Sequence, residues 1–174
     1  ELSMKSSDSL KRTSVSIFEP ILVKEKESQK YRPTLYDFLA HRAIDFFMHD
    51  DTGLTQPAYK FELDNPDYFL PAEKFSMMKI ETKDTLSLKY HAIILLQDLL
   101  KIHLADIEPT ALIDADLKRL KFLKNNSPLS LRKGDGDEAL KDSLYLSSLE
   151  NLEKKFSTHS SSAEIAYEIA NFHF

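Results

Sequence analysis

Residues 31–47, YRPTLYDFLAHRAIDFF, carry the clearest helix signal in the chain and decide its fold class. Thr34 lies where a capping hydroxyl is expected, and Asp37 follows at the position from which a carboxylate reaches back to the backbone. Apolar residues then recur at helical spacing: Leu35, Leu39, Ala43 and Phe46, with Phe38 and Phe47 beside them. The stretch predicts a helix that packs this aromatic and leucine face into a helical core.

The opposite face of the same helix carries Asp37, His41 and Asp45, each four residues from the next. Two carboxylates and an imidazole at this spacing are weak candidates for a metal site, so a small metal-dependent hydrolase is one alternative function. Local charge pairing on a solvated face, with Arg42 nearby, is the more common use of the pattern, and no His-Glu-x-x-His frame is present. We expect a solvated polar stripe with no catalytic residue, metal or cofactor.

Four more main helices are predicted from leucine periodicity and cap residues. Their expected ranges are 85–103, 109–126, 138–156 and 161–174. Asp84 or Thr85 is expected to cap the first, and Ser161 with Glu164 forms a candidate capping box for the last. The buried face of the last helix is expected at Ala163, Ala166, Tyr167, Ala170 and Phe174.

Two segments, 95–120 and 146–172, repeat one pattern at an offset of roughly fifty residues: a leucine-rich helix, a short break and a helix that opens on alanine. Recurring helix pairs of this kind stack into solenoids. The second copy resembles a tetratricopeptide junction, where small residues let neighbouring helices approach closely. The fold class predicted is therefore all-α, a tetratricopeptide-like array of about five main helices.

The segment from residue 50 to residue 85 lacks a helical period and is rich in proline and aromatic rings. An irregular segment this long is unusual inside a compact domain and is often functional, so we expect it to pack against the helices. Its aromatic residues are the candidates for contact with a partner: Tyr59, Phe61, Tyr68 and Phe69.

The organisation predicted is a single helical fragment in three parts. Residues 1–32 form a docking segment with an apolar patch at Ile17, Phe18, Ile21 and Leu22, which Pro20 interrupts. Residues 33–85 hold the first helix and the long loop, and residues 86–174 hold two helix pairs. Because the chain begins without methionine and ends without a helix stop signal, we expect it to be part of a longer protein.

Composition excludes several functions. With 174 residues, 42% of them apolar, the chain can bury a sizeable core, and it has no apolar run of the length that spans a membrane. It has no cysteine, which excludes thiol nucleophiles. The net charge of −5 argues against nucleic-acid binding. A basic run on the 109–126 helix is expected to be a solvated face: Lys118, Arg119, Lys121 and Lys124.

The run YRPTLYDFLAH, the later FLPAEKF and the segment LLQDLLKIHLADIEPTALIDADLKRLKFL together resemble the N-terminal region of the large alpha-2-macroglobulin family proteins of Bacteroidetes. The resemblance extends from about Ser9 to Phe174. It implies a helical segment that precedes macroglobulin sandwich domains, in a parent exported to the periplasm or anchored at the outer membrane. Such parents are thought to trap or inhibit proteases, in some members through a thioester that needs a cysteine.

The resemblance implies a non-enzymatic scaffold or protein-interaction module. Its partners would be other domains of the parent chain, and proteases or envelope proteins beyond them, with no insertion into the membrane by this fragment. The second alternative, beside the hydrolase, is a carbohydrate- or protein-binding helical-repeat envelope protein that stacks sugars on Tyr59 and Tyr68.

Overall fold

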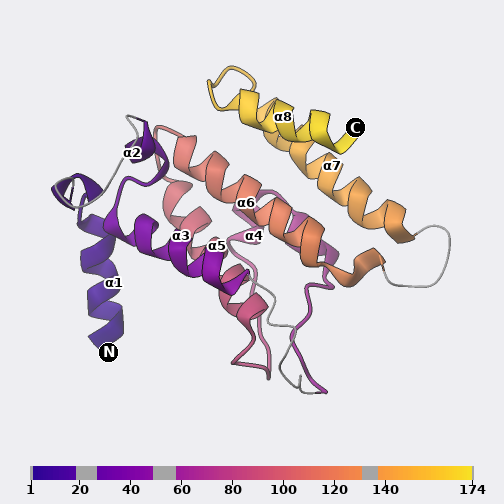
Figure 1. The fold of residues 1–174 in the computed structure, drawn as a ribbon, viewed down its shortest axis with the longest axis horizontal. Coiled ribbons are helices and arrows are strands. Elements are labelled where there is room, and N and C mark those ends of the chain that lie inside the picture. The colour runs from indigo at the N-terminus through magenta and orange to yellow at the C-terminus, as the bar shows by residue number, and fades with distance from the viewer. Residues whose placement is uncertain (1, 19–26, 49–57, 131–136, 174) are drawn as a thin grey trace.

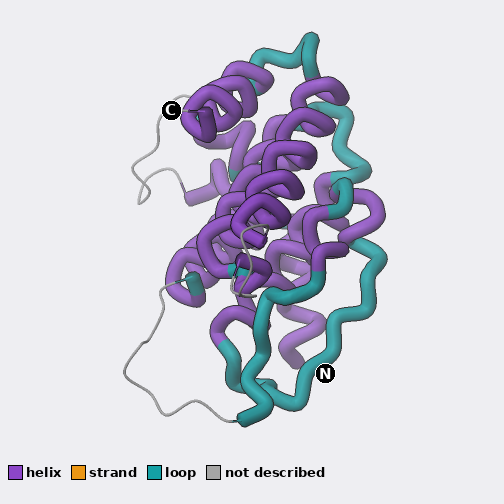
Figure 2. The backbone as a smooth tube through the Cα atoms, turned by 90° about the vertical axis from the view of Figure 1, so that its right-hand side faces the viewer, coloured by secondary structure: helices purple, strands orange, loops and turns teal. Residues whose placement is uncertain are grey.

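The computed structural model describes residues 2–18, 27–48, 58–130 and 137–173, and the regular structure in this part of the chain is helix, joined by loops and with no strand (Figures 1 and 2). The all-α prediction is confirmed. The α-helices are α1 Leu2–Arg12, α2 Ser28–Tyr31, α3 Leu35–Phe47, α4 Ala72–Phe75, α5 Leu88–His103, α6 Thr110–Asn126, α7 Asp137–Phe156 and α8 Ser162–His173. The 3-10 turns are η1 Val15–Phe18, η2 Pro66–Phe69 and η3 Pro128–Ser130.

The long helices pack as a series of neighbours. α3 lies on α5, α5 on α6, α6 on α7 and α7 on α8, while α1 packs against α3. Figure 1 shows α6 between the α3 and α5 side of the molecule and the α7–α8 pair. The predicted pairing of α5 with α6 and of α7 with α8 is confirmed, whereas a tetratricopeptide-like repeat stays a prediction.

The segment after α3 packs against the helices, as predicted. Leu63 and Phe75 are fully buried, and Phe61, Tyr68 and Phe69 are buried beside them. Side chains of α5 and α6 and of the residue that caps α6 bind backbone carbonyl oxygens of this segment: Gln97 donates to Phe75 and Met78, Ser127 donates to Leu63, and Arg119 donates to Tyr68 and Leu70. Irregular backbone is tolerated in the core because its polar groups are satisfied in this way.

The N-terminal segment docks on α3, but the sequence did not predict α1. Of the expected patch, Ile17 is exposed and Phe18 is partly buried, while Val15 is the buried residue; Ile21 and Leu22 lie outside the described residues. Leu35 N donates to Thr13 O and Val15 N donates to Pro33 O, so the backbone around Ser14 pairs with that of Thr34. These bonds fix the start of α3.

The start of α5 also differs from the prediction. Ser87 is the N-cap, and its hydroxyl accepts from Tyr90 N. The Asp84 carboxylate instead accepts from Phe61 N, 3.1 Å away, in the long segment. Asp84, which the sequence offered as a cap of α5, therefore binds the backbone of the long segment instead.

The buried face of α8 is the reverse of the predicted one. Ile165 is fully buried against α7, with Ile169 and Phe172 partly buried, whereas Tyr167 and the three alanines at 163, 166 and 170 are exposed; Phe174 lies outside the described residues. The larger side chains are buried because they remove more apolar surface from water. The capping box is also absent, since Ser161 N donates to His159 Nδ1 and the Glu164 carboxylate accepts from Tyr31 Oη.

No helix in the described ranges is long and apolar enough to cross a membrane.

Candidate functional site

The N-terminus of α3 is built as the sequence predicts. Thr34 Oγ1 accepts from Asp37 N at 3.2 Å, and Asp37 Oδ2 accepts from Thr34 N at 2.8 Å. This is a capping box, and it satisfies two backbone donors that the first turn of a helix leaves without partners. The box holds Asp37 in a fixed position on α3.

The orientation of α3 differs from the prediction, and of the face expected in the core, Leu35, Phe38, Ala43 and Phe47 are only partly buried. The side chains expected in solvent are inside, with Asp37 0% and His41 4% exposed, while Leu39 is 44% and Phe46 67% exposed. Of the polar stripe, only Asp45 is exposed. The buried face also contains Ala40 and Ile44, so α3 approaches α5 on a small side chain and an apolar one.

Charged partners on neighbouring helices explain this orientation. Asp37 lies beside His103 of α5, and His41 lies beside Lys118 of α6, whose Nζ is 3.5 Å from His41 Nδ1. Asp45 Oδ1 is 2.5 Å from the same Nζ. A buried ionisable group is costly without partners, and no pattern within α3 could show that these partners exist.

The centre of this polar cluster is a carboxylate–imidazole–carboxylate chain. His103 Nε2 is 3.1 Å from Asp37 Oδ1, and His103 Nδ1 is 2.7 Å from Asp106 Oδ2. Because both carboxylates only accept, both ring nitrogens donate when the imidazole is charged. Burial opposes that charge, but the hydrogen bonds that the imidazole donates to Asp37 and Asp106 raise the pKa of His103 above its usual value. Burial likewise opposes the charge of Asp37, yet His103 and Thr34 lower its pKa.

His41 lies in a different electrostatic setting from His103. Burial, followed by the positive charges of Arg32 and Lys118, lowers the pKa of His41 to about 2. The Asp114 carboxylate is 3.8 Å from His41 Nε2, but it forms its close ion pair with Arg32 Nη1 at 2.5 Å. His41 is therefore neutral in the folded protein.

The pH dependence of folding should report this neutral His41. The unfolded chain binds a proton below the usual histidine pKa of about 6.5, and the folded chain does not, so stability falls as pH falls. The loss is about 1.4 kcal/mol per pH unit, or about 3 kcal/mol at about pH 4.5. Replacing His41 with leucine should remove this loss. Urea unfolding followed by circular dichroism, at about pH 4.5 and at a pH above about 6.5, would measure it.

Other buried groups titrate in different windows or with a different sign. The raised pKa of His103 adds stability that is complete below its unfolded pKa and is lost at higher pH. The lowered pKa of Asp37 contributes stability that is complete above its usual value of 3.8 and is lost only in stronger acid. Burial raises the pKa of Asp116, which gives the opposite slope above 3.8, so comparison with His41→Leu is needed to isolate His41. Equal acid sensitivity of the variant and the parent would refute the assignment.

The three metal candidates do not converge. Asp37 faces His103, while His41 and Asp45 both lie beside Lys118, whose charge opposes a cation there. Across the described ranges, no group of three or more His, Asp and Glu side chains is arranged to hold a metal ion.

Three of the four predicted contact residues are in the core. Phe61, Tyr68 and Phe69 are buried by the helices, so they stabilise the long segment and present no surface to a partner. Tyr59 is exposed. Sequence alone could not separate these rings, because burial of an irregular segment follows no period.

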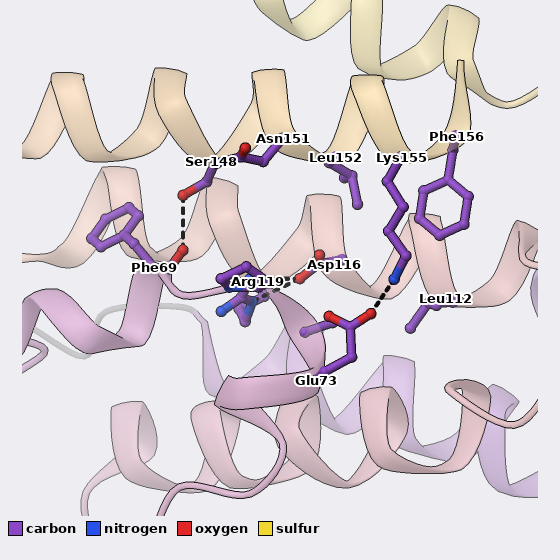
Figure 3. Close-up of a pocket in the computed structure, with 12 residues that line it drawn as sticks. Phe69, Glu73, Leu112, Asp116, Arg119, Ser148, Asn151, Leu152, Lys155 and Phe156 are labelled. Atoms are coloured by element: carbon purple, nitrogen blue, oxygen red, sulfur yellow. Dashed lines mark hydrogen bonds and ion pairs between the residues drawn. The ribbon is translucent and has the colours of Figure 1, made fainter. Parts of the chain in front are cut away.

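A cavity of about 280 Å³ lies between η2 with α4, α6 and α7 (Figure 3). Asp116 and Arg119 line it and are buried, at 3% and 1% exposure. Arg119 Nη2 is 2.7 Å from Asp116 Oδ1, and the guanidinium carbon lies 4.5 Å from the centre of the Phe75 ring. The expectation of a solvated basic run is therefore wrong for Arg119.

A second ion pair, between Lys155 of α7 and Glu73 of α4, lies on the same cavity (Figure 3). It is about half exposed, and the Lys155 hydrogen bond lowers the pKa of Glu73. The sequence interpretation expected Arg119 to be solvated and did not single out Asp116, Glu73 or Lys155. One signal was available: Asp116 and Arg119 lie three residues apart within the apolar pattern of α6, at positions that a helix buries.

Comparison with known proteins gives no match to a protein-family model, to a curated protein or to a solved structure.

Proposed function

We propose that this chain is a non-enzymatic helical module that binds a protein surface through the outward face of α3. The observation that carries the proposal is the orientation of α3, whose ionisable side chains lie in the core while Leu39 and Phe46 are exposed. Following the resemblance of its sequence, the parent is a large alpha-2-macroglobulin-like protein of the cell envelope that inhibits or traps proteases. The surface that α3 contacts belongs to another domain of that parent.

The outward face of α3 has the composition of a binding surface. Leu39, Arg42 and Phe46 follow one another at helical spacing, and the Arg42 guanidinium lies 5.7 Å from the centre of the Phe38 ring. Aromatic residues and arginine dominate the energetically important positions of protein interfaces. Exposed apolar patches on a folded surface commonly mark such interfaces.

The interior of the molecule holds this face in a fixed orientation. A half-turn rotation of α3 would bury Phe46, but it would expose Asp37 and break its hydrogen bond to His103. It would also separate Asp45 from Lys118. The polar contacts thus favour the orientation in which Leu39 and Phe46 are exposed to water. Binding to a protein surface would bury these side chains and offset the cost of their exposure.

Removing the apolar side chains from this face should weaken binding and leave folding intact. The double variant Leu39→Ser, Phe46→Ser should bind the remaining domains of the parent about 30-fold more weakly or worse, as expected for two central interface residues. Its free energy of unfolding should change by about 1 kcal/mol, because Phe46 is 67% and Leu39 is 44% exposed. Surface plasmon resonance and urea unfolding measure the two quantities.

A photo-crosslinking residue in the full-length parent provides an independent check. Placed at position 46, it should crosslink to another domain, whereas the same group at Ile107, an exposed apolar residue between α5 and α6, should not. Equal crosslinking at both positions, or none at position 46, would show that the α3 face is not the contact surface.

A further inference from the structure

Only one oxygen of the buried Asp116 carboxylate has a partner among the residues that the structure describes. Oδ1 accepts a hydrogen bond from Arg119 Nε at 2.8 Å and forms an ion pair with Arg119 Nη2 at 2.7 Å. No donor to Oδ2 is found among the residues that the structure describes, although Asp116 is 3% exposed and lines the cavity. A buried charged oxygen without a donor is costly, so a donor in the cavity would be stabilised there.

The rest of the cavity is suited to an apolar molecule. Its walls include Phe69 from η2, Leu112 from α6 and both Leu152 and Phe156 from α7, which Figure 3 shows around the Asp116 carboxylate. The volume of about 280 Å³ is close to the lower limit for small-molecule sites. Mostly apolar walls with a few polar groups, here the Asp116 carboxylate with Ser148 and Asn151 of α7 nearby, are the usual form of such a site.

The charges around the cavity favour an uncharged ligand. Asp116 is paired with Arg119, and Glu73 is paired with Lys155, so the four groups sum to zero. A cation that reached Asp116 would be opposed by Arg119, and an anion would be opposed by Asp116 itself. A neutral hydroxyl can donate to Oδ2 without disturbing either ion pair.

We propose that this cavity binds a small uncharged alcohol with a largely apolar body, whose hydroxyl donates to Asp116 Oδ2. The side chains of Phe69, Leu112, Leu152 and Phe156 hold the apolar body. The proposal is independent of the α3 surface, because the cavity lies among η2, α4, α6 and α7.

Phenol and toluene are the probes, because they share a ring and differ in the hydroxyl donor. Titration followed by NMR should show saturable phenol binding, with shifts of the amide signals of α4, α6 and α7 around the cavity. Toluene should bind about tenfold more weakly or worse, since it leaves the charged acceptor unpaired. Equal affinity for the two probes, or no saturable phenol binding, would overturn the proposal.

Variants assign the binding to this cavity. Asp116→Asn can turn its amide NH₂ towards the cavity and should reduce the preference for phenol to about twofold or less. The matched control Asp142→Asn, on α7 outside the cavity, should keep the full preference. Ala72→Leu places a larger side chain in the cavity and should abolish binding of both probes. If phenol binding survives Ala72→Leu unchanged, the site lies elsewhere and the proposal fails.

Discussion

Replacing Arg119 with alanine is expected to lower the free energy of unfolding by about 3–5 kcal/mol, because the change leaves a buried charge without its partner. Asp116 would lose the hydrogen bond from Arg119 Nε and the ion pair with Arg119 Nη2. The carbonyl oxygens of Tyr68 and Leu70, which Arg119 Nη1 binds at 2.5 Å and 2.9 Å, would lose that donor inside the protein. One side chain thus joins η2 to α6 in addition to neutralising a carboxylate.

Urea unfolding followed by circular dichroism measures this loss, since the chain contains no tryptophan for fluorescence. The control is Lys121→Ala on the same helix, which removes an ion pair between the 47% exposed Lys121 and the 15% exposed Glu168 and should cost less, about 1 kcal/mol. The double variant Asp116→Leu, Arg119→Met removes both charges and should recover a part of the stability. Equal losses in the two single variants would mean that Arg119 behaves as a surface cation.

Replacing Asp37 with alanine is expected to cost about 3–5 kcal/mol as well, because it removes the partner of a buried charged group. The change deletes the carboxylate side of the capping box and takes one acceptor from the His103 imidazolium, leaving only Asp106. Asp37→Asn should cost less, about 1–2 kcal/mol, because its amide can accept from Thr34 and donate to Nε2 of a neutral His103.

The control for Asp37 is Asp45→Ala, two turns further along α3, where the carboxylate is mostly exposed. That variant should lose about 1 kcal/mol or less. The two interpretations of α3 make different predictions here. A solvated polar stripe predicts equal small losses at both positions, whereas the observed burial predicts a large loss only at Asp37. Thermal unfolding of the three variants at neutral pH distinguishes them.

Local signals in the sequence were read correctly where the deciding contact is local. The Thr34–Asp37 capping box, the range of α6 and the end of α7 follow from residues within a few positions of one another. The packing of the long segment against the helices also followed from the sequence, because a long irregular segment with this many aromatic rings is expected to bury them. The prediction from neighbouring residues was wrong where a residue distant in sequence offers a competing partner. Asp84 was a candidate cap of α5, and its carboxylate instead accepts from Phe61 N.

The faces of α3 and α8 could not be predicted from their own patterns. Each helix has two faces with apolar residues, so periodicity allowed either face to be buried. In α8 the buried face contains Ile165, because α7 packs against this helix and covers the larger side chain. In α3 the buried face contains Asp37 and His41, because α5 and α6 supplied ionic partners.

The sequence by itself determined that this protein is built from helices, where long helices such as α6 and α7 begin and end, and that its irregular segment is part of the core. These features depend on backbone propensity, caps and total apolar content, which lie close together along the chain. The tertiary structure alone decided which side of α3 meets solvent and which charges line a cavity. A buried ion pair such as Asp116–Arg119 is stable only where surrounding carbonyls and rings accept it, and those groups come from residues about fifty positions away.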